Sequence, residues 1–261
     1  MSEIIAIVNQ KGGVGKTTTT INLAAYLTYF GKKVLVIDID SQGNASSGLG
    51  INYKELESSM YEVLIPGPIT MKHVILSTGL EGLHLAPASP DLAGASVDLV
   101  SVDEREFQLL RNLDDIKEYY DFVLIDCPPS LGLLTINALS AATDVLIPVQ
   151  SEYYALEGLG QLLNTINLIQ ENLNPKLNIL GAVLTMYDKR NKLSEGVFNE
   201  LYKYFPNRIF RTVIPRNVRL AEAPSHGKSI LDYDFRSPGA KAYERLAREV
   251  LESYNLFKIK N

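Results

Sequence analysis

The sequence predicts a single-domain α/β protein whose mostly parallel, twisted sheet is flanked by helices on both faces. Short runs of valine, isoleucine and leucine without polar alternation recur along the chain, which is typical of strands buried on both faces. Longer segments with helical spacing of apolar residues separate these runs, and this alternation is typical of helices packed on a parallel sheet. A chain of 261 residues is long enough for one large core.

The expected elements alternate in order along the chain. The expected strands cover residues 4–8, 34–37, 83–86, 122–125, 145–149 and 177–184. The expected helices cover residues 17–30, 104–119, 133–142, 158–172, 193–204 and 239–254. Gly31 suits the end of the first helix, and the proline-rich piece 65–68 is expected to be a loop. Because no repeat or charged linker interrupts the pattern, residues 1–261 are expected to form one domain.

Composition excludes several classes of protein. The single cysteine, Cys127, excludes a disulfide framework within one chain and a metal cluster that needs several cysteines from one chain. The N-terminus lacks the basic and apolar regions of a signal peptide, and no apolar run approaches the roughly 18 residues of a membrane span. These features favour a cytoplasmic protein.

Charge is distributed unevenly along the chain. Residues 1–184 hold 10 lysines and arginines against 21 acidic residues, a balance of −11, whereas residues 185–261 hold 15 against 9, a balance of +6. A basic region on an otherwise acidic protein forms either solvated helix faces or a surface that meets nucleic acid. Charge alone leaves both alternatives open.

A glycine-rich segment between the first strand and the first helix predicts a phosphate-binding loop. It follows the pattern G-x-x-x-x-G-K-[ST], except that Gln10 stands at the first glycine position. Glycines allow backbone N–H groups to surround phosphate oxygens, and the helix that follows adds its positive end. The expected nucleotide-binding residues are Lys11, Gly12, Gly13, Val14, Gly15, Lys16, Thr17 and Thr18. The predicted fold is therefore that of a P-loop NTPase that hydrolyses its nucleotide with Mg²⁺.

Individual side chains of this loop have distinct expected roles. Lys16 would reach the β- and γ-phosphates, and Thr17 would bind Mg²⁺ through its hydroxyl. Lys11 lies at the loop entrance, where it could supply charge to a transferring phosphoryl group in its own subunit or in a partner's.

Carboxylates follow two of the expected strands. Asp126 ends the run 122–125, where it would hold Mg²⁺ directly or through water. Asp38 and Asp40 come at the end of the second strand, and in an extended stretch they would share one face. One of them would orient or activate the attacking water and the other would support the lysine or the metal, but spacing alone does not say which residue has which role.

Four segments together resemble the ParA/Soj partitioning ATPases, which are P-loop ATPases with a deviant Walker A motif. These segments are residues 11–18, 38–44, 121–130 and 213–234, and the resemblance extends over essentially the whole chain. The resemblance implies an ATP-dependent sandwich homodimer in which Lys11 crosses to the partner's nucleotide. It also implies that Asp40 activates water and that Asp126 belongs to the second acidic motif. Met186, Pro215, Arg216 and Asn217 fall where the family contacts adenine.

The resemblance also implies partners. The family's dimer binds double-stranded DNA without sequence preference through basic residues, and Arg190 and Arg219 match those positions. Lys189, Lys192 and Arg211 are further candidates. The implied protein partner is a ParB-type centromere-binding protein that stimulates slow hydrolysis, and the implied location is the nucleoid in the cytoplasm.

Some features depart from the family pattern or favour alternatives. Ser41 and Phe235 stand where the family often has proline, and the chain begins at the first strand without a helix-turn-helix extension, which suits the short chromosomal type. A membrane-surface ATPase of the Min type is the alternative function, but the end at 252–261 has few apolar anchors, so no membrane partner is expected. A metabolic reductase or ligase on the same scaffold is a third alternative.

Overall fold

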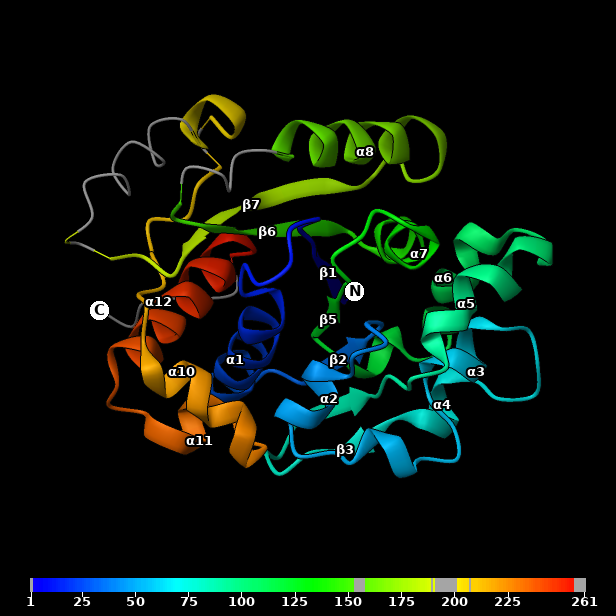
Figure 1. The fold of residues 1–261 in the computed structure, drawn as a ribbon, viewed down its shortest axis with the longest axis horizontal. Helices are drawn as coiled ribbons and strands as arrows, with labels where there is room; N and C mark the ends of the chain where they lie inside the picture. The colour runs from blue at the N-terminus through cyan, green and yellow to red at the C-terminus, as the bar shows by residue number, and fades with distance from the viewer. Residues whose placement is uncertain (1, 153–157, 189, 191–200, 207, 256–261) are drawn as a thin grey trace.

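The computed structural model describes residues 2–152, 158–188, 190, 201–206 and 208–255 (Figure 1). Seven strands form one sheet in the order β3-β4-β2-β5-β1-β6-β7. Their bounds are β1 Glu3–Ile7, β2 Val34–Asp38, β3 Leu76–Ser77, β4 Leu83–Ala86, β5 Phe122–Asp126, β6 Asp144–Gln150 and β7 Asn178–Thr185. All neighbouring strands are parallel except β3 and β4. The predicted mostly parallel sheet is confirmed.

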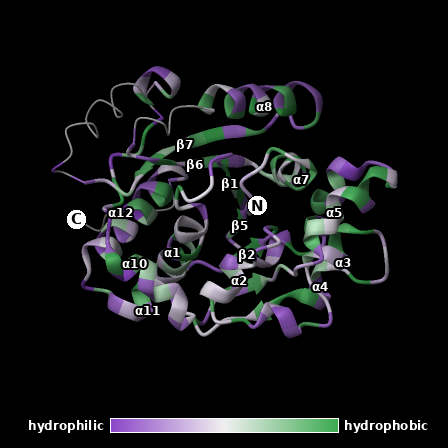
Figure 2. Ribbon diagram, viewed as in Figure 1, coloured by the Kyte–Doolittle hydropathy of each residue, from purple (hydrophilic) through white to green (hydrophobic). Residues whose placement is uncertain are grey.

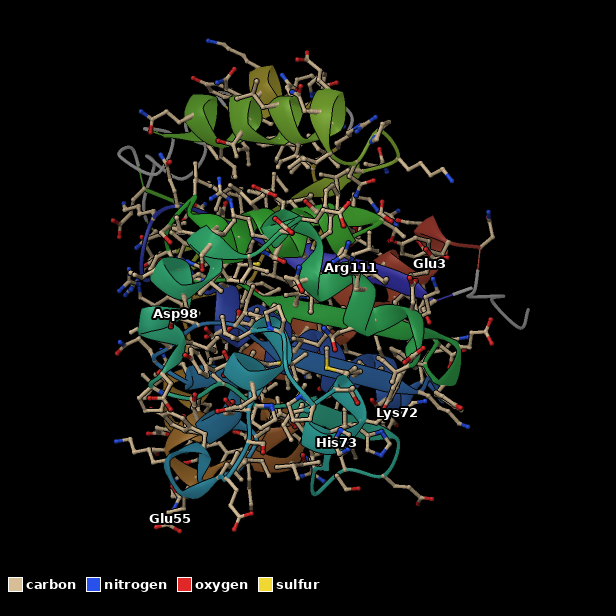
Figure 3. All side chains as sticks on the ribbon, turned by 90° about the vertical axis from the view of Figure 1, so that its right-hand side faces the viewer. Glu3, Glu55, Lys72, His73, Asp98 and Arg111 are labelled. Atoms are coloured by element: carbon tan, nitrogen blue, oxygen red, sulfur yellow. The ribbon has the colours of Figure 1, made fainter. Side chains whose placement is uncertain are left out.

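Helices cover both faces of the sheet (Figure 1). One face carries α1 Lys16–Tyr29, α2 Asn44–Gly48, α10 Val218–Glu222, α11 Ile230–Asp234 and α12 Pro238–Ser253. The other carries α3 Met60–Leu64, α4 Met71–Val74, α5 Leu92–Asp98, α6 Gln108–Asp114, α7 Leu133–Ala141 and α8 Leu159–Asn172. Short 3₁₀ turns are η1 Tyr53–Glu55, η2 Leu99–Ser101, η3 Arg105–Phe107, η4 Lys117–Tyr119 and η6 Ala223–His226. Figure 3 looks onto the second face, where Asp98 of α5 and Arg111 of α6 lie.

The central strands are apolar between their ends because they contribute to two cores at once. In β1, Ile4 and Ala6 belong to the core under α7 and α8, whereas Ile5 and Ile7 belong to the core under α1 and α12. Successive side chains of a strand point to opposite faces, so a strand with helices on both sides needs no polar residues. Figure 2 accordingly shows the strands inside the molecule mainly in the hydrophobic colour.

The helices differ in places from those that the sequence predicts. The helix expected at 104–119 is broken into η3, α6 and η4, and Glu104 has a left-handed φ of 50° where that helix was to begin. The helix expected at 193–204 lies mostly outside the described residues. The short helices α2 to α5 were not expected, since segments of 4 to 7 residues are too short to show a clear helical period.

The parallel arrangement brings several strand ends to one edge. Residues 8–15 follow β1, residues 39–43 follow β2, and Cys127 follows β5. Asp38 and Asp126 are register partners on adjacent strands, so the two residues lie side by side. In the described part of the chain, no helix is both long and apolar enough to span a bilayer.

Candidate functional site

The loop between β1 and α1 has the geometry of a phosphate cradle. Gly13 and Gly15 have left-handed φ values of 73° and 88°. Glycine adopts this conformation at little energetic cost because it has no Cβ. Gly15 precedes the 14-residue helix α1 and offers no side chain to its first N–H groups. Those N–H groups therefore remain available to an anion, where the helix dipole also favours negative charge. The expected strand–loop–helix context is confirmed.

A cavity of about 460 Å³ lies beside this loop. Its lining residues come from distant parts of the chain: Gly12, Gly13, Gly15, Lys16, Thr17, Thr18, Ile21, Asp40, Gln42, Asn44, Ser47, Pro129, Met186 and Pro224. Most of the expected phosphate-loop residues thus meet Asp40 and Met186 in one space.

Lys16 is almost completely buried at the wall of this cavity. Its Nζ donates a hydrogen bond to the backbone oxygen of Lys11 at 3.2 Å, so the loop folds around its own lysine. Burial lowers the pKa of the Lys16 ammonium, and the nearby Asp126 carboxylate partly opposes that shift. An incoming phosphate would supply the counter-charge that this buried ammonium favours.

Asp126 lies behind Thr17 at the end of β5. Its Oδ2 accepts a hydrogen bond from Thr17 Oγ1 at 2.7 Å, and its Oδ1 accepts one from Thr20 Oγ1 at 3.0 Å. Burial raises the pKa of Asp126 to about 8, with a further contribution from Asp38. A cation beside this carboxylate would offset that cost.

These oxygens fit Mg²⁺. Mg²⁺ prefers oxygen ligands, keeps several waters and is usually held by one or two carboxylates together with substrate phosphates. Thr17 Oγ1 and the Asp126 carboxylate provide such oxygens next to the loop. Among the described residues, no cluster of three or more His, Cys, Asp or Glu side chains forms a metal cage, and a phosphate-bound Mg²⁺ needs none.

Asp38 and Asp40 differ in their surroundings, although both come from the same stretch of chain at the end of β2. Asp40 lines the cavity, is 8% exposed, and its Oδ1 accepts a hydrogen bond from the Gln42 N–H at 3.0 Å. Asp38 is fully buried and bonds to Ser46 instead. The extended course of β2 continues through Ile39, whose N–H donates to the backbone oxygen of Asp126 at 3.1 Å, and the turn comes at residues 41–42.

Lys11 does not line the cavity of its own chain, although its backbone is well fixed. The Lys11 N–H donates to Asn9 Oδ1 at 2.9 Å, and Asn9 Nδ2 donates to the backbone oxygen of Pro148 at 2.8 Å. The base of the Lys11 side chain is thereby held at the loop entrance.

The four residues expected near adenine lie in three different places. Met186 lines the phosphate cavity with a left-handed φ of 51°, and its backbone oxygen accepts a hydrogen bond from Ser151 Oγ at 3.1 Å. Pro215 and Arg216 line a separate hollow of about 750 Å³. Asn217 lines neither, and its buried Oδ1 lacks a hydrogen-bond partner among the described residues. The adenine contacts of all four residues stay a prediction.

The arginines expected to meet DNA are exposed and lie in ion pairs with neighbouring carboxylates. Arg190 pairs with Asp188 at 2.8 Å, Arg219 with Glu222 at 2.8 Å, and Arg211 with Glu252 at 3.0 Å. The Arg190 guanidinium lowers the pKa of Asp188 to about 2 by hydrogen bonding. Lys189 and Lys192 lie outside the described residues.

Several residues of the site were not expected from sequence. Arg236, Lys241 and Arg245 line the 750 Å³ hollow together with Arg190, and only their place in the basic C-terminal region hinted at this. Thr20 could have been found, because it lies three residues after Thr17 on the same helix face. Pro224 carried no sequence signal for its place in the phosphate cavity.

Comparison with known proteins first defines the class. A family model described as an AAA domain matches residues 2–179, which is well over half of the chain. Together with the glycine loop and the parallel sheet, this match makes the protein a P-loop ATPase.

The relatives then define the family. The sporulation initiation inhibitor protein Soj of Bacillus subtilis is 56% identical over 250 residues, which cover 96% of this chain and 98% of that protein. A cobyrinic acid a,c-diamide synthase from Mycobacterium smegmatis, solved with ADP and magnesium, has a TM-score of 0.87 and 38% identity over 98% of this chain and 96% of its own. The septum site-determining protein MinD of Pyrococcus horikoshii, solved with Mg-ADP, has a TM-score of 0.77 and 29% identity over 96% of each chain. The chain belongs to the ParA/Soj family of chromosome-partitioning ATPases.

Proposed function

We propose that this partitioning ATPase is a nucleotide-driven dimerisation switch on DNA. Binding of Mg·ATP forms a homodimer, the dimer binds double-stranded DNA without sequence preference, and hydrolysis releases it. A ParB-type centromere-binding protein stimulates the hydrolysis. The protein then works in the cytoplasm, on the nucleoid.

The observation that carries this proposal is the position of Lys11. Lys16, Thr17 and Asp40 line the cavity of their own chain, whereas Lys11 lies at the loop entrance outside that lining. A lysine placed there fits a role in a nucleotide of the partner subunit, where it would add positive charge to the transferring phosphoryl group. The nucleotide then bridges two copies of the chain.

The residues in and behind the cavity have separate roles in ATP hydrolysis. Lys16 neutralises the β- and γ-phosphates, and Thr17 with Asp126 holds Mg²⁺, which is the cofactor and polarises the phosphate oxygens. Asp40 is the carboxylate at the cavity wall, so it orients the attacking water and accepts its proton. Lys16, Asp40 and Asp126 are buried, so the surrounding protein shields them from bulk water.

DNA binding follows from exposed charge rather than from a shaped groove. Arg190 and Arg219 have side chains that are 89% and 54% exposed, and their ion-pair partners are also on the surface. Exposed pairs are weak and screened by salt, so phosphates can replace the carboxylates at small cost. Contacts of this kind do not read bases and weaken steeply with salt.

A nucleotide-dependent DNA-binding assay tests the switch. With Mg·ATP, the Asp40→Ala variant should accumulate as a dimer that hydrolyses little ATP and binds DNA. With ADP, the protein should be a monomer that does not bind DNA. Molecular mass in solution and retention on DNA are measured with ATP, with ADP and without nucleotide. Equal DNA binding in all three states would contradict the switch, and pelleting with lipid vesicles instead of DNA would favour the Min-type alternative.

A further inference from the structure

One buried carboxylate holds both ends of the segment that carries Asp40. Asp38, the last residue of β2, is fully buried, and its Oδ1 accepts a hydrogen bond from the Asp40 N–H at 3.2 Å. Its Oδ2 accepts two hydrogen bonds from Ser46, one from the backbone N–H and one from the hydroxyl, both at 2.8 Å. The start of the segment and the middle of α2 are therefore tied to the same side chain.

Ser46 extends this connection to the neighbouring strand. Its Oγ accepts a hydrogen bond from the Ala88 N–H at 3.1 Å, just beyond the end of β4. Because the hydroxyl proton is given to Asp38 while the oxygen accepts from Ala88, the Ser46 side chain has both of its roles filled. Ser46 is fully buried, so water does not compete for these bonds.

The segment between the two ends depends on this connection. The Gln42 N–H donates to Asp40 Oδ1 at 3.0 Å, and the Gln42 backbone oxygen accepts from Tyr53 at 2.8 Å. The direction of the Asp40 carboxylate is thus set by backbone that Asp38 and Ser46 fix. Neither Asp38 nor Ser46 lines the cavity, so their influence on the Asp40 carboxylate passes through this backbone.

We propose that Asp38 and Ser46 are positioning residues for ATP hydrolysis. They form a buried clamp that keeps the Asp40 carboxylate directed into the cavity, where it meets the attacking water. Small errors in the position of a reacting group are costly in rate, whereas the phosphate loop, which binds the nucleotide, does not depend on the clamp. This inference rests on the proposed function, in which Asp40 activates that water.

Ser46→Ala tests the clamp. The variant removes the hydroxyl bond to Asp38 and the acceptor of the Ala88 N–H, but it keeps the backbone bond to Asp38. We expect kcat for phosphate release at saturating Mg·ATP to fall about 10- to 100-fold, while the Kd for a non-hydrolysed Mg·ATP analogue stays at the wild-type value. Ser140→Ala is the matched control, because Ser140 is a buried serine of α7 whose hydroxyl has no hydrogen-bond partner among the described residues.

Parallel variants keep the outcomes distinct. Asp38→Asn should likewise lower kcat and leave the Kd for the analogue unchanged. If Asp38→Asn does not fold, Ser46→Ala alone decides the test. Wild-type kcat in Ser46→Ala, beside lost hydrolysis in Asp40→Ala, would overturn the clamp and leave the proposed function intact. A joint loss of kcat and nucleotide affinity would show a purely structural role and would also overturn it. Normal hydrolysis by Asp40→Ala would refute the role of Asp40 in the proposed function, and the clamp with it.

Discussion

The phosphate-loop region, residues 9–46 together with Asp126 of β5, and the basic region, residues 185–255, use charge in opposite ways. In the first, Lys16, Asp38 and Asp126 are buried, and each is held by hydrogen bonds to backbone or hydroxyl groups. In the second, Arg190 and Arg219 are exposed and pair with carboxylates a few residues away. The first region holds its charged groups buried around a preformed cavity, whereas the second exposes its charged groups at the surface.

This difference has an energetic cause. A buried charge pays a desolvation cost, so its partners must be in place and single losses are severe. An exposed ion pair contributes about 0–1 kcal/mol, so its charges can exchange partners. The first region suits specific recognition of one ligand, and the second suits an extended polyanion met at many positions.

The largest effect is expected for Lys16→Ala. Removing the buried ammonium leaves phosphate oxygens without their charged donor, and such bonds contribute about 1.5–3 kcal/mol each. ATP affinity should therefore fall by about 100-fold, measured by titration with a fluorescent ATP analogue.

Lys11→Ala is the contrasting variant within the same loop. It should retain ATP affinity in the monomer but lose the ATP-dependent increase in molecular mass. If both lysines behave alike, the assignment of Lys11 to the partner's nucleotide fails, and the loop is an ordinary single-chain site.

An intermediate effect is expected for Arg190→Glu. The variant should keep ATP-dependent dimerisation but bind DNA about tenfold more weakly, with a smaller salt dependence, because one phosphate contact is lost from each subunit. Fluorescence anisotropy with duplex DNA over a series of salt concentrations measures both quantities.

Arg111→Glu makes the same change of charge on the opposite side of the molecule. Arg111 lies on α6, on the face shown in Figure 3, is 53% exposed and pairs with Glu104. DNA affinity should be unchanged in this control. An equal loss in both variants would mean that net charge, and not the basic region, governs binding.

The smallest effect concerns pH. Burial raises the pKa of Asp38 to about 6 and that of Asp126 to about 8, above the usual unfolded value of about 4. Between about pH 4 and 8 the folded state therefore binds more protons than the unfolded state, so the free energy of unfolding falls as pH rises.

Thermal unfolding of the nucleotide-free protein measures this dependence. The Tm should fall by about 3 °C or more between about pH 5.5 and 8.5. Asp38→Asn removes one of the two carboxylates, so its Tm should depend less on pH than that of the wild type. Parallel Tm curves for the two proteins would show that the buried pair does not govern stability in this range.

The sequence was informative where structure is local. The six expected strands are confirmed, because strands buried on both faces consist mainly of apolar residues. The phosphate loop could likewise be predicted, because its glycines and Lys16 lie within eight consecutive residues beside one cavity. The Arg219–Glu222 pair also follows from spacing, as the two residues are three apart on α10.

What the sequence could not predict depends on contacts between distant segments. Ser46 and Ala88 meet only because β2 and β4 are neighbours in the sheet, and no local pattern marks either residue. Pro224 enters the cavity because η6 packs against α2. The different surroundings of Asp38 and Asp40 likewise depend on tertiary contacts, because Asp38 bonds to Ser46 of α2 whereas Asp40 lines the cavity.

The order of the strands also limits how two copies can meet. At one edge of the sheet, β3 has only two residues and runs antiparallel to its neighbour. At the other edge, the segment 208–216 covers β7, with bridges between Ala182 and Ile209 and between Tyr187 and Pro215. Within the described residues, neither edge offers a long free strand for joining two sheets into one. Self-assembly of this chain by strand addition is thereby disfavoured.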